Sequence, residues 1–250
     1  MRNQALGWMV AAFLMVTGTL AAEPLEDLRA RLAGMRNDRP TRVRVDVEVR
    51  HRGSAPLHLN RDKKRGRAII AFTPDRGVKM LDQRWTGTGT RFSVWKKSQS
   101  NGESRLLDFV EAEDLVDPAA FMEVYLDGAT LLKDEEASWQ GQPARLLVFR
   151  PGPLSPQGKD DAEASARADR LPYAFEAKVW LDETGAPLAM ERSFETRLGP
   201  ALAVTDLQNL TFQQVGGRLL VAEARQDYSG TALAVLRGRD SKKVKVTEVR

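Results

Sequence analysis

The stretch RVRVDVEVR, residues 42–50, alternates a valine with a charged side chain at every step. Successive side chains of a β-strand point to opposite faces, so this period of two predicts a strand with its valines buried and its charges in water. Sheets with one buried and one wetted face are mostly antiparallel. The stretch therefore predicts an antiparallel sheet at the centre of the fold.

Further stretches with strand character follow at short intervals. They lie at 67–72, 78–82, 92–97, 105–110, 144–150, 174–181, 188–195, 203–213, 218–228 and 243–249. Asn101-Gly102 is a hairpin turn signal, and compact turns are expected at 183–185 and 215–217. Because connections this short can join only antiparallel neighbours, we expect one long antiparallel sheet.

Two segments have helical spacing instead. The apolar residues between Leu25 and Met35 recur at helical intervals behind Pro24, which predicts a short amphipathic helix. Asp117 and Pro118 offer an N-cap and a first-turn proline for a second helix that runs toward residue 128. The fold class is therefore mainly β with a few helices (α+β).

The amino-terminal 22 residues have the order of a secretory signal peptide. Arg2 precedes an apolar stretch at 5–16, and Thr19 and Ala21 place small side chains where a signal peptidase reads. We expect cleavage after Ala21 or Ala22 and a periplasmic mature protein. The alternative is an uncleaved helix that anchors the chain in a membrane.

Residues 23–250 are expected to form a single domain. Of the 250 residues, 42% are hydrophobic, which is enough for one sizeable core. Residues 151–170 are rich in Pro, Gly, Ser, Ala and Asp without an apolar period, so they are expected to form a surface loop.

The composition argues against an enzyme. The chain has no cysteine and two histidines, which excludes thiolate nucleophiles, disulfides and cysteine zinc sites. His51 and His58 fall in or beside one expected turn, where exposed loop histidines are the simplest interpretation. The acidic groups Glu111/Glu113 and 134–136 are expected to face water in charged loops. We expect no catalytic residues, no metal and no cofactor.

Two basic clusters, at 61–67 and 237–245, could contact anionic lipid headgroups. The candidate contact residues are Lys63, Lys64, Arg65, Arg67, Lys242 and Lys243. The alternative is a solvated turn that protects a sheet edge. Nucleic acid is disfavoured because of the export signal, and the net charge of +4 is small for a nucleic-acid-binding protein.

The segment AKVWLDETGAPLAME at 177–191, together with the opening helix and strand, resembles the LolA/LolB-like lipoprotein-localisation superfamily and related outer-membrane lipoprotein-sorting proteins. The resemblance implies a strongly curved antiparallel sheet forming an incomplete barrel. One or two helices beside the N-terminal one would cover its concave face, which would accept lipid. The segment 151–170 departs from the family pattern, and no binding residue of the family can be transferred.

A concave apolar face would be lined by inward-pointing strand residues. The candidates are Val45, Val47, Val49, Phe92, Val94, Phe175, Val179 and Leu188, for which plain core packing is the alternative. The expected function is a non-enzymatic periplasmic binding or carrier protein for a lipid, an acyl chain or a lipidated protein, with peripheral membrane contact. The alternatives are a sensor or scaffold that binds an envelope protein and, third, an exported hydrolase.

Overall fold

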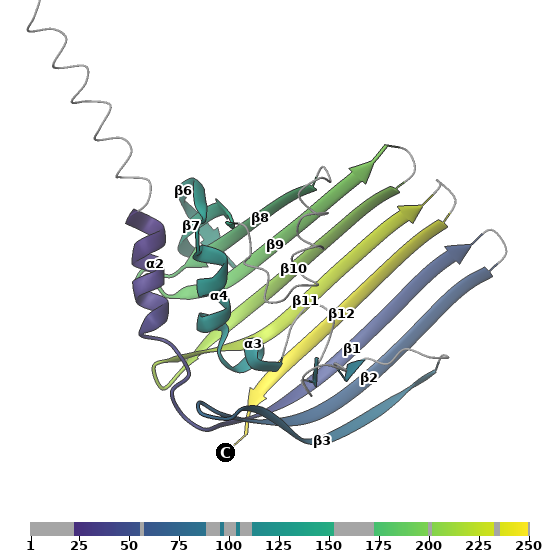
Figure 1. Cartoon of the computed structure of the whole chain (residues 1–250), viewed down its shortest axis with the longest axis horizontal. Helices are drawn as coiled ribbons and strands as arrows, with labels where there is room; N and C mark the ends of the chain where they lie inside the picture. The colour runs from purple at the N-terminus through teal and green to yellow at the C-terminus, as the bar shows by residue number, and fades with distance from the viewer. Residues whose placement is uncertain are drawn as a thin grey trace, which may run out of the picture.

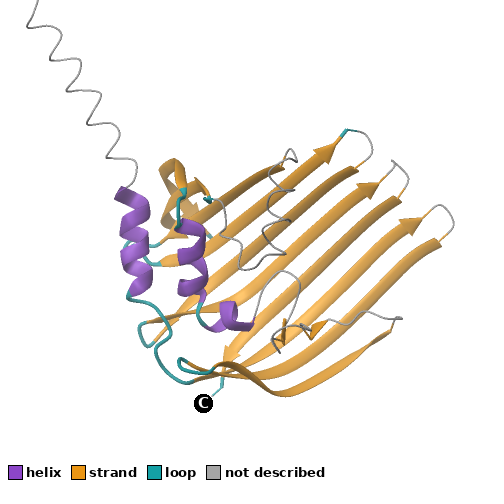
Figure 2. Ribbon diagram, viewed as in Figure 1, coloured by secondary structure: helices purple, strands orange, loops and turns teal. Residues whose placement is uncertain are grey.

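The fold is a ten-stranded antiparallel sheet with three short helices against one of its faces (Figures 1 and 2). The computed structural model describes residues 23–55, 58–88, 96–97, 104–105, 112–152, 173–199, 202–232 and 236–249. The strand order is β3-β2-β1-β12-β11-β10-β9-β8-β7-β6, and every neighbouring pair is antiparallel. The two edge strands, β3 and β6, do not pair, so the sheet is not closed. The predicted fold class is confirmed.

The strands of the sheet are long for a globular protein. They are β1 (Thr41–Ala55), β2 (His58–Thr73), β3 (Gly77–Thr88), β6 (Thr130–Trp139), β7 (Gln142–Arg150), β8 (Tyr173–Leu181), β9 (Pro187–Leu198), β10 (Leu202–Val215), β11 (Arg218–Ala232) and β12 (Leu236–Glu248). Two further short strands, β4 (Lys96–Lys97) and β5 (Ser104–Arg105), pair with each other, in agreement with the hairpin signal between them. The pairing of β1 with β12 brings the first and last strands of the domain together.

Strand β6 was missed by the sequence patterns. Its residues Asp134, Glu135 and Glu136, expected in a charged loop, lie on the strand that forms one edge of the sheet. An edge strand is wetted more than a central one, so its charge-rich sequence lacks a clear apolar alternation. Glu113, also expected in a loop, lies in the helix α3 (Ala112–Val116).

The other helices are α2 (Glu23–Ala33) and α4 (Pro118–Leu126), and both agree with the predictions. The α2 helix buries Leu25, Leu28 and Leu32, the residues that share its apolar face. Asp117 caps α4, because its carboxylate accepts a hydrogen bond from the backbone N–H of Ala120. The three helices lie over one end of the strands, and the strands extend past the helices at the other end (Figure 1).

Two apolar clusters form the core between the helices and the sheet. One joins the valines of β1 to β2, β11, β12 and α3, and includes Leu115 and Val116. The other joins α2 and α4 to β7, β8 and β9, and includes Leu28, Met122 and Phe149. Strands β1, β2, β7, β8 and β12 contribute alternate residues to these clusters, as the period of two requires.

Several predictions fall on residues outside the described ranges. These are the signal segment at 1–22, most of the expected loop at 151–170, and the candidate residues Phe92 and Val94. No helix in the described ranges is long and apolar enough to cross a membrane.

Candidate functional site

The inner face of the sheet, which the helices contact, is organised in rows that run across the strands. In antiparallel strands, directly paired residues point to the same face, so the pairing defines each row. One row is apolar from β2 to β7: Gly66, Val47, Val244, Ala224, Leu210, Met190, Val179 and Leu147. It forms part of the core under the helices.

The next row, toward the end of the strands away from the described helices, is polar along much of its length. Its members are Lys64, Val49, Lys242, Gln226, Gln208, Arg192, Ala177 and Phe149. We call Lys64, Lys242, Gln226, Gln208 and Arg192 the polar belt. Its members Lys242, Gln226 and Arg192 are buried. Buried polar side chains normally have hydrogen-bond partners, so we expect specific contacts to hold the belt in place.

Arg192 joins the polar belt to helix α4. Its guanidinium donates hydrogen bonds to the Tyr125 hydroxyl and to Gln208 Oε1. It also lies 4.5 Å from the ring centroid of Phe121 and 5.0 Å from that of Tyr125. Two aromatic faces and two acceptors therefore stabilise a charge that is only 5% exposed.

Asp206, one row further along β10, ties the two belt glutamines together. Gln226 Nε2 lies 2.9 and 2.8 Å from the two carboxylate oxygens of Asp206, and Gln208 Nε2 donates to the same carboxylate at 2.9 Å. Gln226 Oε1 is buried and has no hydrogen-bond partner among the described residues. This oxygen is an acceptor that a ligand donor or a water could satisfy.

His51 and Asp240 pair across β1 and β12 on the inner face, in the same row as Asp206 and Tyr228. His51 Nδ1 is hydrogen-bonded to Asp240 Oδ1. His51 therefore lies on a strand, with a side chain only 30% exposed, and its placement in an exposed turn was wrong. The β1 strand continues through the expected turn as far as Ala55, and His58 begins β2.

A row of glycines follows, formed by Gly53, Gly238 and Gly230 on three adjacent strands. A Cβ atom at Gly53 would lie 3.1 Å from His51 Nε2, and one at Gly230 would lie 3.5 Å from the Tyr228 hydroxyl oxygen. Among the described residues, a Cβ at Gly238 would meet no atom within 4 Å. The glycines thus accommodate the His51 and Tyr228 rings, and no described residue fills the space above Gly238.

The candidate apolar residues divide between the part of the inner face under the described helices and the part away from them. Val45, Val47, Val49 and Val179 are buried members of the core clusters. Phe175 is half-buried and lies in the row of His51 and Asp240, with its ring 6.0 Å from that of Tyr125. Leu188 is half-buried at the irregularity where β8 and β9 change register.

The candidate basic residues lie on both faces of the sheet. Lys63, Arg65, Arg67 and Lys243 are on the outer face, whereas Lys64 and Lys242 belong to the inner polar belt. The six candidates therefore do not share one surface, and their contact with lipid stays a prediction. Both clusters lie on strands rather than in turns, so neighbouring residues alternate between the two faces.

The polar belt was missed from the sequence. The sequence feature that corresponds to the belt is a change, along a strand, from apolar to polar residues at the positions that point to the inner face. On β10 this change lies between Leu210 and Gln208. That signal has meaning only once the register aligns the changes on several strands. Among the described residues, no group of three or more His, Asp or Glu side chains is placed to hold a metal ion.

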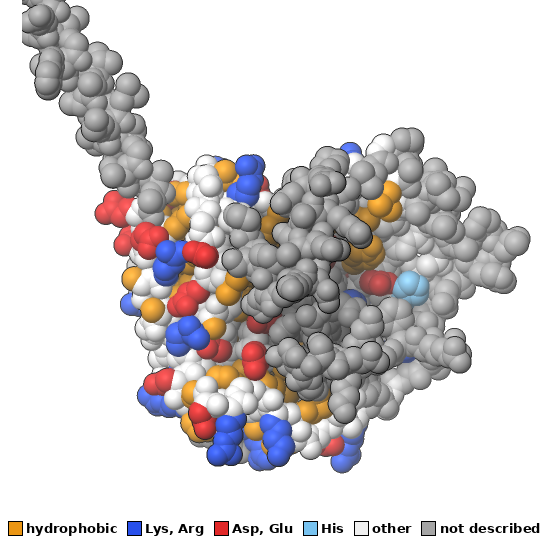
Figure 3. All heavy atoms as spheres, viewed as in Figure 1, with side chains coloured by type: hydrophobic (Ala, Val, Ile, Leu, Met, Phe, Trp, Pro, Cys, Tyr) orange, Lys and Arg blue, Asp and Glu red, His pale blue; other side chains and the backbone are white. Residues whose placement is uncertain are grey.

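Viewed from the side of the helices, charged side chains of both signs cover the helices and the lower rim, and hydrophobic side chains show between and beyond them (Figure 3). The strand pairing gives the inner face apolar and polar rows in a fixed order. Such an order suits an amphiphilic ligand, whose apolar and polar parts need different surroundings.

No family model matches the chain, and no curated protein matches it. Among solved structures, it is similar to a DUF1329 family protein from Desulfovibrio piger, with a TM-score of 0.39 and 9% identity over 91% of each chain. It is also similar to a putative outer membrane lipoprotein-sorting protein domain from Vibrio parahaemolyticus, with a TM-score of 0.37 and 14% identity over 92% of each chain. A structure of lipovitellin with its lipid–protein interactions has a TM-score of 0.34 and 9% identity. That match covers 86% of this chain and 26% of lipovitellin.

Proposed function

We propose that this protein is a non-enzymatic binding or carrier protein of the cell envelope, and that its inner face takes a lipid or the acyl chain of a lipidated protein. The observation that carries the proposal is the order of the rows on that face. An apolar row is followed by the polar belt, then by a mixed row with aromatic rings, and then by glycines.

On β8 to β10, the mixed row and the glycine row offer an apolar surface beside helix α4. Phe175 and Phe194 pair directly across β8 and β9, and Val204 lies near them on β10. All three are half-buried. Aromatic and branched side chains of this kind contribute most of the contact area in lipid and small-molecule sites.

The polar belt suits the head of such a ligand. Lys64, Lys242 and Arg192 carry positive charge on the same inner row, and His51 with Asp240 adjoins them. Cationic groups that are held in place by the protein bind phosphate or carboxylate with charge-assisted hydrogen bonds. A head group at the belt would leave its chain on the aromatic and glycine rows.

Delivery of the chain to the envelope follows from the signal segment predicted at 1–22, which lies outside the described residues. The mature protein would then carry its ligand through the periplasm. Amino-terminal sequencing of the protein from its host tests this step, because export should remove residues 1–22.

Substitution of Gly238 by Trp tests the ligand site. Its backbone does not have a positive φ, and a Cβ meets no described residue within 4 Å, so the strand should accept the larger residue. An indole there would displace about four methylene groups of a bound chain, worth roughly 3 kcal/mol at about 0.8 kcal/mol each. We expect about 100-fold weaker binding of a fluorescent fatty-acid probe.

Arg239→Trp is the matched control, because Arg239 is the next residue on β12 and is exposed on the outer face. It should bind the probe like the wild type. Native mass spectrometry of protein from its own host should show a co-purifying lipid. A wild type that takes up no acyl probe and carries a stoichiometric protein instead would favour the scaffold function, and hydrolysis of an ester probe that His51→Gln abolishes would favour a hydrolase.

A further inference from the structure

The outer face of β12, β1, β2 and β3 is strongly basic. Its described side chains include four basic residues on β1, three on β2, two on β3 and four on β12, against the acidic residues Asp46, Glu48 and Asp82. On β8 and β9 the same face carries Lys178 and Arg197 against three glutamates. The positive charge is therefore concentrated on one half of the outer face.

The acidic residues within this face do not neutralise it. Asp46 lies 3.2 Å from Arg44 and 2.8 Å from Arg67. Glu48 lies 2.5 Å from Arg50 and 3.5 Å from both Lys63 and Arg65. Two carboxylates thus share five cations, so at least three positive charges remain in excess.

The electrostatics of Glu48 agree with this surplus. The hydrogen bond from Arg50 lowers the pKa of the Glu48 carboxyl below its ordinary value, against partial burial, which raises it. The positive charges of Arg50, Lys63 and Arg65 add to the lowering. Glu48 therefore stays ionised at neutral pH, and the surplus above already includes its charge.

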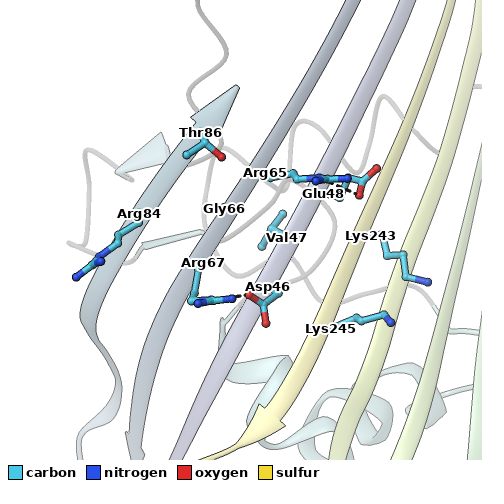
Figure 4. A pocket seen from close by; sticks show the side chains of 10 residues that line it. All are labelled: Asp46, Val47, Glu48, Arg65, Gly66, Arg67, Arg84, Thr86, Lys243 and Lys245. Carbon is cyan, nitrogen blue, oxygen red and sulfur yellow. Dashed lines mark hydrogen bonds and ion pairs between the residues drawn. The ribbon is translucent and has the colours of Figure 1, made fainter. Parts of the chain in front are cut away.

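Figure 4 shows how these side chains surround a shallow hollow of about 400 Å³. Arg65 and Arg67 reach from β2 toward the carboxylates of β1, and Lys243 and Lys245 lie on the β12 side. Arg84 lies on the β3 side, with 83% of its side chain exposed. On the described part of the chain, Arg237, Arg239 and Lys245 make no ion pair, so their charge is open to a ligand.

We propose that this outer basic face, on the side of the sheet opposite the inner site, docks on a membrane that carries anionic phosphate lipids. Basic side chains on adjacent strands stand about 4.8 Å apart and repeat along each strand, so many phosphates can be contacted at once. Contact with a lipid surface requires only point charges of one sign. None of the described side chains on this face is aromatic, although stacking on aromatic rings is how single-stranded nucleic acids are usually held.

The proposal does not depend on the ligand of the inner face, and vesicle binding tests it separately. The full mature protein is mixed with vesicles of phosphatidylcholine alone or with 30% phosphatidylglycerol, and the bound fraction is measured after sedimentation. The test variant replaces Arg65, Arg84 and Lys245 by Gln. The control variant replaces Lys133, Arg150 and Arg197 by Gln, which removes the same charge from the other half of the outer face.

We expect the wild type to bind the anionic vesicles at low salt, to bind the neutral ones far less, and to be released by 0.5 M salt. The test variant should partition roughly 100-fold more weakly, or about 3 kcal/mol, and the control variant only a few-fold more weakly. Circular dichroism and the melting temperature verify that both variants fold, as their exposed positions suggest. Equal weakening by the two variants, or equal binding to neutral vesicles, would overturn the proposal. Binding of duplex DNA at a salt concentration that releases the vesicles would assign the face to nucleic acid instead.

Discussion

Removal of the Arg192 side chain would show how firmly the polar belt holds helix α4 to the sheet. The guanidinium makes charge-assisted hydrogen bonds to Tyr125 and Gln208, each worth about 1.5–3 kcal/mol, and lies over two aromatic rings for roughly another 1–2 kcal/mol. Against this gain stands the cost of burying the charge, several kcal/mol, which the alanine variant recovers. The variant also leaves a cavity and two polar groups without their donor.

The balance predicts that Arg192→Ala lowers the free energy of unfolding by about 3 kcal/mol. For a domain of this size, that loss corresponds to a fall in melting temperature of roughly 6–12 °C. Arg192→Met keeps the apolar stem and should lose about half as much, because the sulfur and methylene groups still fill the space between the rings.

Urea unfolding followed by circular dichroism measures these changes, with the tryptophan fluorescence as a second probe. Arg197→Ala is the control, since Arg197 lies on the same strand but is exposed on the outer face, and it should change stability by less than about 0.5 kcal/mol. A loss below about 1 kcal/mol for Arg192→Ala would refute the idea that this residue fastens α4 to β9 and β10.

Two further predictions concern pH and backbone packing. The hydrogen bond from Arg145 lowers the pKa of Asp134, and although burial raises the pKa of Asp182, hydrogen bonds from Thr184 and the backbone N–H of Ala186 bring it below its ordinary value. The two carboxylates therefore contribute fully to the free energy of unfolding above their ordinary pKa of 3.8, and this contribution is lost as the pH falls through their lowered pKa values. The urea midpoint should decrease below about pH 4, and less steeply in Asp182→Asn. An unchanged slope in that variant would contradict the prediction. Gly152→Ala should destabilise the fold by about 1–3 kcal/mol in thermal unfolding, because its Cβ would lie 2.4 Å from the Asp127 carbonyl oxygen, whereas Gly238→Ala should be tolerated; equal melting temperatures for the two variants would show that the Asp127–Gly128 backbone gives way.

The local elements could be predicted from the sequence because short-range physics determines them. The alternation at 42–50 lies in β1, the apolar spacing from Leu25 lies in α2, and Asp117 caps α4. The apolar alternation was too weak to predict β6, because this edge strand is rich in charged residues. In the basic clusters, Lys64 and Lys242 each have another lysine beside them and differ from it only by the face of the sheet they occupy.

The sequence by itself determined that this chain forms an antiparallel sheet with one apolar and one charged side, because alternation along a strand is a local property. The tertiary structure alone decided which residues share a row. His51 and Asp240 are 189 residues apart, and the glycines at 53, 230 and 238 adjoin because β1 pairs with β12 and β12 with β11. Register between distant strands depends on the packing of the whole sheet, so the polar belt, the space that the described residues leave at Gly238 and the basic outer face exist only in the folded chain.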